Sequence, residues 1–339
     1  MAANWQPVPM SSLPNWAGDP LTDAWPALQA NCKRMGARAP WQSFCAAVSA
    51  SLPISPAAAR ALLTQHLQAY ALQLDTKTPA VGVATGYFEP IYAGALSRGG
   101  IYQWPVYSSP PSPFALLSRA EITPVGREPH PAVRGRELAW LSNPIDAFLA
   151  QVQGSARITL PDGSTKRLAY AAKNGQPYVS IANTLVAQGV FTLPQASMER
   201  IRTWAAGQAA GGNVNAIQSV LNTNPSFVFF RWGEDVSADQ ATVGPVGALG
   251  VPLTALRSVA IDPAHTPLGT PIWLETRIGA GVSSNLPFSQ LMLAQDTGSA
   301  IKGAARVDIY FGTGDAAGAL AGRQKYPSRV WVLWPKTKP

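Results

Sequence analysis

The stretch from Leu291 to Gly314 constrains the fold of this chain most strongly, because it alternates apolar runs with glycine-rich turns and carries two aspartates. Asp296 follows the apolar residues Leu291–Ala294, and Asp308 precedes the apolar residues Ile309–Phe311. Short apolar runs separated by turn-forming residues are typical of β-strands. The stretch is therefore predicted to fold as strand, turn, strand and turn, with each aspartate at a strand end near a cleft.

The composition also favours strands and turns. Charged residues make up 13% of the 339 residues, whereas the chain has 31 prolines and 29 glycines. Hydrophobic residues, at 47%, suffice for folded cores, and the length exceeds what a single core usually fills. We therefore expect a mainly β chain with helices, organised as one large or two moderate domains.

The charge distribution argues against nucleic acid as a partner. The net charge of +8 comes from basic residues that are spread along the chain and not gathered into one run. No apolar run reaches the about 20 residues of a membrane-spanning helix, and the residues after Met1 lack the charged and apolar regions of an export signal. We expect a soluble chain; a protein from which an export signal had been removed would look the same.

Three helices are predicted near the N-terminus. Apolar residues recur at helical spacing over 20–35, a second helix is expected over 41–50, and Ser55 before a proline is a typical helix start. Cys32 and Cys45 then lie on adjacent helices, where they form either a disulfide or two buried thiols. Two cysteines without a CxxC spacing, and three isolated histidines, predict no metal site.

The next part of the chain is predicted as a long strand and a long connection. The strand covers 81–92, and Glu89 near its end is expected to be a solvated turn residue. Tyr87 and Phe88 are either sugar-stacking aromatics or core residues. Residues 105–136, rich in proline, serine and arginine, resemble a connection into a separate unit.

The strands near both chain ends and the block between them suggest one domain interrupted by an inserted one. We expect the first domain to comprise 1–104 and 236–339, and the inserted β-rich domain to comprise 105–235. The predicted elements of the block are a helix from Asn143 to Gly154, strands over 155–160, 165–172 and 177–181, helices over 195–206 and 214–221, and a strand over 227–230. Further strands are expected over 257–262, 271–275 and 329–334.

Carboxylates are the candidate catalytic groups, because the chain has no GxSxG, HExxH or Walker motif. Asp262, Asp296 and Asp308 all lie in glycine-containing, strand-like surroundings and are the acids best placed to converge. Cleavage of a glycosidic bond needs an acid for the leaving oxygen and usually a second carboxylate as base or nucleophile. The apolar neighbours of Asp308 favour its protonated form, which a general acid needs.

The string Asp296-Thr297-Gly298-Ser299 supports a rival interpretation, because it is also the active-site signature of aspartic peptidases. That mechanism requires two such aspartates that share a proton. The chain has no second D-[ST]-G string. The peptidase interpretation is therefore weaker than glycan cleavage.

Six longer strings occur in the same order as in a known family. They are TGYFEPIY (85–92), NPIDAFLAQVQGSARITLPDG (143–163), YAAKNGQPYVSI (170–181), NPSFVFFR (224–231), GPVGALGVPLTALRSVAIDPAHTPLGTPIWLE (244–275) and AQDTGSAIKGAARVDIYFGTG (294–314). These strings resemble the MltA-type membrane-bound lytic transglycosylases, and the resemblance covers most of the chain from about Asn15 onward. It implies a double-psi β-barrel domain formed from both chain ends, with a smaller β-rich domain inserted between them and a glycan groove in the cleft.

The resemblance also implies an activity. Family members cleave the β-1,4 bond between N-acetylmuramic acid and N-acetylglucosamine in peptidoglycan without hydrolysis, leaving a 1,6-anhydromuramyl end. By analogy, Asp308 is the single catalytic acid and then base, Asp296 and Asp262 support it, and no cofactor is needed. The strings that match the family imply the following groove residues: Thr85, Gly86, Tyr87, Gln153, Gly154, Ser155, Tyr170, Lys173 and Asn174.

Location and partners follow from the same resemblance. It implies a monomer that acts on peptidoglycan strands at the periplasmic face of the outer membrane, with a lipid anchor in the precursor and with cell-wall synthesis or division proteins as candidate partners. Neither an export signal nor a lipidated cysteine is visible in the sequence, and an oxidising periplasm would favour the bridge between Cys32 and Cys45. Two alternatives remain: hydrolysis of a wall glycan by Asp296 and Asp308, and a non-catalytic glycan-binding barrel.

Overall fold

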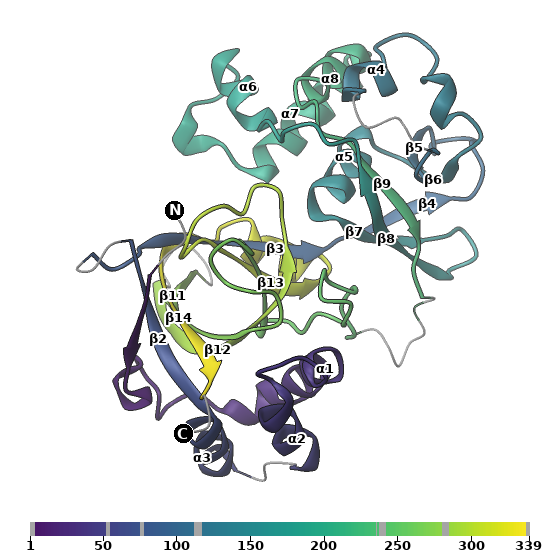
Figure 1. Cartoon of the computed structure of the whole chain (residues 1–339). Coiled ribbons are helices and arrows are strands. Elements are labelled where there is room, and N and C mark those ends of the chain that lie inside the picture. Colours follow the sequence, from purple (N-terminus) through teal and green to yellow (C-terminus); the bar gives the residue numbers. More distant parts are fainter. Residues whose placement is uncertain are drawn as a thin grey trace. The chain divides into compact units, whose positions relative to one another are not determined.

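The computed structural model describes residues 4–51, 55–74, 78–111, 117–234, 236, 242–279 and 285–336. The chain divides into two compact units, Met1–Phe88 with Thr242–Pro339, and Glu89–Ala241; Figure 1 labels most of their elements. Among the described residues, none of the helices has the length and apolarity that a membrane crossing requires.

Six strands of the first unit close into a barrel. Their order is β14 (Lys325–Pro335), β11 (Pro271–Gly279), β12 (Asn285–Thr297), β10 (Ser258–Ile261), β13 (Val307–Thr313) and β3 (Gly82–Glu89), and β3 pairs again with β14. β10 runs parallel to β12, whereas β11 is antiparallel to both β12 and β14. Because β3 comes from the N-terminal part of the chain and the other five strands from the C-terminal part, both ends build the barrel.

Alternate residues of the barrel strands point into an apolar core. On β11, Ile272 and Leu274 belong to this core, whereas Trp273 between them packs with the N-terminal helices. The same alternation recurs on β12 and β14. Successive side chains of a strand point to opposite faces, so one face of β11, β12 and β14 fills the barrel and the other face packs against the N-terminal helices.

The N-terminal segment packs on the outside of the barrel. The order of its elements is β1 (Asn4–Val8), a 3-10 helix (Met10–Ser12), a second 3-10 helix (Leu21–Ala24), α1 (Trp25–Met35), α2 (Gln42–Ala50), α3 (Pro56–His66) and β2 (Leu67–Gln73). The strands β1 and β2 extend the sheet beyond β14. The Ser55 side chain accepts a hydrogen bond from the N–H of Ala58 and begins α3, as predicted. A disulfide joins Cys32 of α1 to Cys45 of α2.

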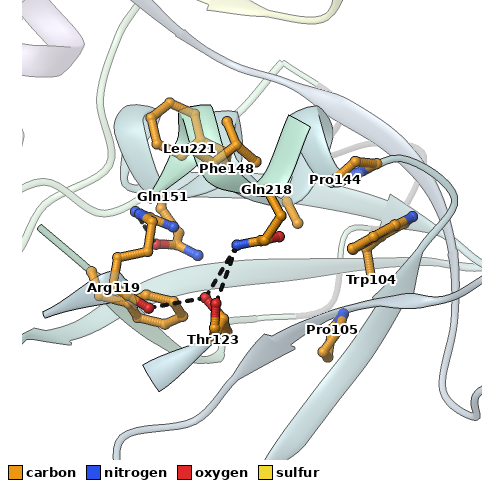
Figure 2. Close-up of a pocket in the computed structure, with 11 residues that line it drawn as sticks. Trp104, Pro105, Arg119, Thr123, Pro144, Phe148, Gln151, Gln218 and Leu221 are labelled. Atoms are coloured by element: carbon orange, nitrogen blue, oxygen red, sulfur yellow. Dashed lines mark hydrogen bonds between the residues drawn. The ribbon is translucent and has the colours of Figure 1, made fainter. Parts of the chain in front are cut away.

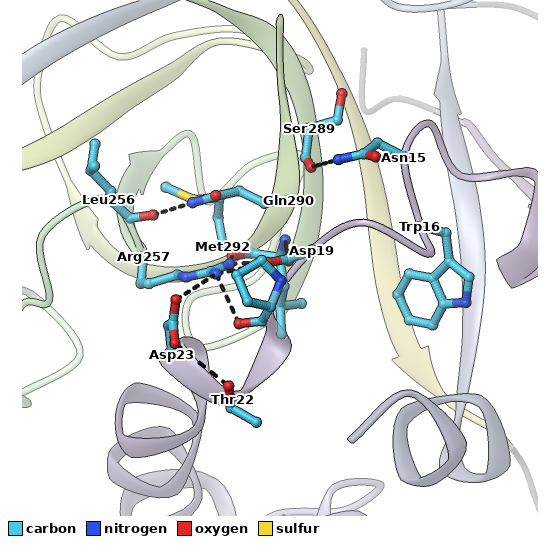
Figure 3. Close-up of polar contacts among 12 residues, drawn as sticks. Asn15, Trp16, Asp19, Thr22, Asp23, Leu256, Arg257, Ser289, Gln290 and Met292 are labelled. Carbon is cyan, nitrogen blue, oxygen red and sulfur yellow. Dashed lines mark hydrogen bonds and ion pairs between the residues drawn. The ribbon is translucent and has the colours of Figure 1, made fainter. Parts of the chain in front are cut away.

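A buried ion pair fixes this segment to the barrel (Figure 3). The Arg257 guanidinium donates to both carboxylate oxygens of Asp19, at 3.0 and 2.7 Å, and to the carbonyl of Leu291 at 2.9 Å. The N–H of Leu291 donates to the same aspartate at 2.7 Å. Burying two charges is favourable only when their hydrogen bonds are satisfied, and here both groups are. The pair therefore locks the entry to α1 against β12.

The second unit is built on a six-stranded sheet. Its order is β5 (Trp104–Tyr107), β6 (Glu137–Leu141), β4 (Ile91–Ala95), β7 (Ser155–Thr159), β8 (Thr165–Lys173) and β9 (Val228–Trp232). Its helices are α4 (Arg119–Ile122), α5 (Pro144–Gln153), α6 (Ile181–Ala187), α7 (Met198–Ala210) and α8 (Val214–Leu221), with 3-10 helices at Pro131–Val133 and Leu193–Gln195. In the first unit, α9 (Asp315–Ala321) follows β13. Residues of α5 to α8 share an apolar core with β4 to β9.

Helix α5 has the limits that its sequence predicts. The Asn143 side chain accepts a hydrogen bond from the N–H of Ile145 at 2.8 Å, and Pro144 occupies the first turn. Gly154 ends the helix with φ 79°, a left-handed conformation that glycine adopts without steric cost.

The single strand predicted over 81–92 is wrong. Pro90 separates it into β3, which closes the barrel, and β4, which lies in the sheet of the second unit. Glu89 is not a solvated turn residue but is fully buried, where Arg157 and Arg167 each donate to it at 2.7 Å. Two buried arginines make the burial of this carboxylate possible.

The domain boundaries also differ from those expected. The structure divides the chain between Phe88 and Glu89 instead of after residue 104, because β4 and β5 pair with β6 in the second sheet. The chain returns to the first unit between residues 241 and 242, whereas the sequence predicted this boundary between 235 and 236. The predicted connection over 105–136 contains part of β5, together with α4 and a 3-10 helix.

The strand predicted over 177–181 is wrong as well. Residues 177–180 are irregular, and Ile181 begins α6. Asn224 Oδ1 accepts the N–H of Val179 at 3.0 Å, so this backbone group bonds to a side chain and not to a neighbouring strand.

Replacing Cys32 and Cys45 together by alanine should lower the free energy of unfolding by about 3 kcal/mol, because the disulfide restricts the unfolded chain. Urea denaturation followed by circular dichroism measures this change. Reduced wild-type protein is the matched control, and its free energy of unfolding should fall by about the same amount as that of the double variant. Equal free energies for the oxidised protein and the double variant would contradict the expectation.

Candidate active site

Asp308 lies on β13 and contacts Thr85 of the neighbouring strand β3. The Thr85 hydroxyl donates a hydrogen bond to Asp308 Oδ1 at 2.5 Å. On the other side of β13, Ala260 of β10 is opposite Asp308 in the antiparallel register. Asp308 is partly exposed, so its carboxyl group is held by the barrel wall and can still meet a ligand.

The surroundings of Asp308 change its acidity. Burial raises the pKa of Asp308 to about 6; the Thr85 hydrogen bond and the Arg306 guanidinium oppose this rise, and Asp296 adds to it. Such a carboxyl is partly protonated near neutral pH. It can therefore donate a proton to a leaving oxygen and later take one back.

Asp296, at the end of β12, is held by three donors. Its Oδ1 accepts the N–H groups of Ala248 at 3.0 Å and Thr297 at 2.9 Å, and its Oδ2 accepts the Tyr87 hydroxyl at 3.0 Å. Burial raises the pKa of Asp296, and these three hydrogen bonds work against the rise. Burial, together with the charges of Asp296 and Asp308, raises the pKa of Tyr87 well above its usual value, so Tyr87 stays a donor.

Asp262 differs from Asp296 and Asp308, because its pKa is lowered and not raised. It is 6% exposed and follows β10. Its carboxylate accepts the N–H groups of Gly303 at 2.9 Å and Ala264 at 3.2 Å, and Lys302 Nζ lies 3.8 Å away. Burial opposes its charge, but the two N–H groups and Lys302 outweigh burial and hold the pKa of Asp262 below its usual value. Asp262 is therefore an ionised carboxylate that holds turns.

Two regions of the chain match known domain families. Residues 113–231 match the MltA specific insert domain, and residues 257–334 match the 3D domain. The chain is 36% identical over 261 residues to the membrane-bound lytic murein transglycosylase A of Escherichia coli strain K12, a match that covers 75% of this chain and 66% of that protein.

Solved structures resemble the whole chain. The lytic transglycosylase LtgG of Burkholderia pseudomallei is 40% identical, with 99% of this chain and 97% of that one covered and a TM-score of 0.66. The chain belongs to the MltA-type lytic transglycosylase family. A second member, E. coli MltA with bound chitohexaose, is 29% identical, with 99% and 95% covered and a TM-score of 0.76. Membership confirms the fold class expected from the sequence, a double-psi β-barrel formed by both chain ends with an inserted β-rich domain.

Of the groove residues that the MltA resemblance implies, three lie in the barrel unit. Thr85 and Tyr87 contact Asp308 and Asp296. Gly86 has a packing function instead, because a Cβ atom there would lie 2.6 Å from the Phe311 ring. The site thus uses the two polar side chains of β3 that flank this glycine.

The other six lie in the MltA-type insert. Tyr170 and Lys173 are exposed on β8, and Gln153 and Gly154 end α5. Ser155 is buried at the start of β7. Asn174 is fully buried; its Nδ2 donates to the carbonyls of Leu117 and Pro225 at 2.7 and 2.8 Å, and its Oδ1 accepts the N–H of Phe227 at 2.9 Å. Asn174 therefore holds three chain segments together and is not free to bind a glycan.

Sequence reasoning missed Arg306. Its Nη1 donates to the carbonyl of Val83 at 3.1 Å and also to that of Val307, and its charge acts on Asp308. The signal was its position two residues before Asp308, immediately before the start of β13. Among the described residues, no group of three or more His, Cys, Asp or Glu side chains is arranged to hold a metal ion.

The opposite pKa shifts of Asp308 and Asp262 predict opposite effects of asparagine on stability. The raised pKa of Asp308 means that its charge costs stability above the unfolded pKa, so Asp308→Asn should stabilise the protein at pH 7 and have little effect at pH 4. The lowered pKa of Asp262 means that its charge contributes stability at pH 7, which Asp262→Asn should remove. Urea denaturation at both pH values measures the two differences. Shifts of the same sign at pH 7 would contradict this assignment.

Proposed function

We propose that this protein is a lytic transglycosylase that cleaves the β-1,4 bond between N-acetylmuramic acid and N-acetylglucosamine in peptidoglycan and forms 1,6-anhydromuramyl ends. Such an enzyme is a lyase that acts on a polysaccharide. The observation that carries the proposal is the carboxyl of the partly exposed Asp308, whose pKa of about 6 suits both proton donation and proton acceptance. Family membership supports the same reaction.

The reaction needs one carboxyl group in two roles. Protonated Asp308 gives its proton to the glycosidic oxygen as the bond from that oxygen to C1 of the muramyl residue breaks. The carboxylate then takes the proton of the muramyl 6-hydroxyl as O6 attacks C1 and closes the 1,6-anhydro ring. The protons balance, and Asp308 is again protonated for the next cleavage.

The contacts of Asp296 favour this single-acid mechanism over hydrolysis by two carboxylates. Hydrolysis would need Asp296 to act as base or nucleophile through a remaining lone pair, and each hydrogen bond that a carboxylate accepts lowers its basicity. Both oxygens already accept hydrogen bonds, from Tyr87 and from the N–H groups of Ala248 and Thr297. Asp296 therefore orients Tyr87 and contributes negative charge near Asp308, and Asp262 holds the turn at Gly303.

The substrate is a glycan strand. An E. coli relative binds the oligosaccharide chitohexaose, which supports an extended sugar site here. In the insert, the exposed ring of Tyr170 suits stacking on a sugar face. The exposed Lys173 on the same strand suits contacts with the polar groups of the sugar. Gln153 at the end of α5 is a further polar candidate.

We also propose that the protein belongs to the cell envelope. The relatives are named membrane-bound, and the disulfide between Cys32 and Cys45 fits an oxidising compartment such as the periplasm. A lipid anchor at the outer membrane, a monomeric state and contacts with cell-wall synthesis or division proteins complete the proposal.

The decisive product is the muropeptide end. Purified peptidoglycan treated with the wild-type protein should release muropeptides with 1,6-anhydromuramyl ends, and Asp308→Asn should reduce their release by at least about a thousandfold because the only acid is lost. Mass spectrometry of the released fragments measures both.

Asp162→Asn, which changes an exposed turn residue of the insert, is the matched control and should keep full activity. Reducing muramic ends, one water heavier, would instead support hydrolysis with Asp296 as partner. Binding to the wall without any release would support a glycan-binding barrel.

Thr85→Val should move the pH dependence of cleavage. The Thr85 hydrogen bond stabilises the charged form of Asp308, so its removal should raise the pKa of Asp308 above about 6. Because cleavage begins with protonated Asp308, the loss of activity on the alkaline side should then occur at higher pH. Initial rates of fragment release between acid and alkaline pH measure the shift. Thr85→Ser keeps the hydroxyl and should retain the wild-type profile; an unshifted profile in both variants would contradict the role of this bond.

A further inference from the structure

A small pocket in the insert contains a buried positive charge (Figure 2). Arg119 lines it together with Trp104, Phe148, Gln151 and Gln218. The volume is about 50 Å³, which on the scale of one water per about 10–15 Å³ accommodates a group of a few heavy atoms. Trp104 and Gln218 are partly exposed, so the pocket can be reached from the surface of this unit.

Arg119 has no acidic partner within the described part of the chain. It is 4% exposed, and no carboxylate described in the structure lies within ion-pair distance of its guanidinium. A buried charge without a counter-charge is costly. Burial lowers the pKa of Arg119 to about 9, so the guanidinium is still charged at neutral pH.

The neighbours of Arg119 fix its position and leave donors unused. Nε donates to the carbonyl of Asn224 at 3.1 Å, and Nη2 donates to Gln151 Oε1 at 2.8 Å and to the carbonyl of Ser226 at 2.6 Å. The N–H groups of Nη1 make no hydrogen bond to a described residue. Because a guanidinium has five N–H donors, two remain for a ligand.

Aromatic rings keep the guanidinium in this orientation. Its Cζ lies 4.7 Å from the centre of the Phe148 ring and 4.9 Å from that of Phe227. Such contacts hold the plane of the guanidinium without neutralising its charge. A ligand therefore meets a preformed planar donor beside apolar walls, to which Trp104 also contributes.

We propose that this pocket is a second binding site, which takes a small carboxylate of the size of acetate on Nη1 of Arg119. A carboxylate supplies the missing negative charge and accepts planar N–H donors. The apolar rings suit a methyl or methylene group beside it better than they suit a wholly polar phosphate. The same chemistry is offered by a free small acid and by the terminal carboxylate of an alanine residue, such as a peptide chain end.

Isothermal titration at constant ionic strength tests the site with acetate and with acetamide, its neutral counterpart of the same shape. Acetate should bind with a stoichiometry of one, and acetamide should not bind. N-acetyl-D-alanine and its amide distinguish the two sources, because a chain-end site should bind the acid more tightly than acetate, whereas a site for free acids should prefer acetate. None of these probes carries a sugar, so the result does not depend on cleavage by Asp308.

Two variants locate the binding. Arg119→Gln removes the charge, and Ala147→Leu adds a side chain on α5 at a position that lines the pocket; each should weaken acetate binding at least tenfold. Arg134→Gln, which changes an exposed arginine of the same unit, should leave it unchanged. Thermal melting verifies that each variant folds. If Arg119→Gln does not fold, the acetate affinity of Ala147→Leu tests the proposal. Absence of saturable acetate binding, equal binding of acetamide, or full affinity in a folded Ala147→Leu protein would overturn the proposal.

Discussion

The pairing of β3 with β13 and β14 is the interaction on which the candidate site depends. It closes the barrel and brings Thr85 to Asp308 and Tyr87 to Asp296, across sequence separations of 223 and 209 residues. Close approach is possible because a Cβ atom at Gly82 would lie 2.2 Å from the Ala305 carbonyl oxygen, and one at Gly86 would meet Phe311. Glycine therefore occupies the two positions of β3 where a side chain would clash with a neighbouring segment. The polar residues Thr85 and Tyr87 flank the second of these glycines.

The same barrel shifts the pKa values of its aspartates in different directions, through the balance of burial against hydrogen bonds and nearby charge at each one. Asp262 is ionised because backbone N–H groups and Lys302 outweigh burial, whereas Asp308 receives a single hydroxyl from Thr85 and keeps a raised pKa. Burial also raises the pKa of Asp296, although this carboxyl accepts three hydrogen bonds that oppose the rise. Neither burial nor the hydrogen bonds alone separate an acid catalyst from a structural carboxylate; the balance of burial, hydrogen bonds and nearby charge sets the pKa of each one.

Buried arginines stabilise each unit in a different way. Arg257 neutralises Asp19 and joins the N-terminal segment to β12, and Arg157 with Arg167 neutralises Glu89 at the start of the insert. These carboxylates are fully paired, so their arginines are structural. Arg119 differs, because rings and carbonyl groups surround it in the described structure and no carboxylate does.

Local patterns in the sequence determined the helix that starts at Ser55, the limits of α5, the alternation along the barrel strands and, through family strings, the acids of the site. These features depend on neighbours within a few residues. Only the tertiary structure decided that Pro90 separates two sheets and that Glu89 and Asn174 are buried. The physical reason is that burial, ion pairing and pKa arise from groups that lie far apart in the chain, and no local pattern specifies which of them will meet.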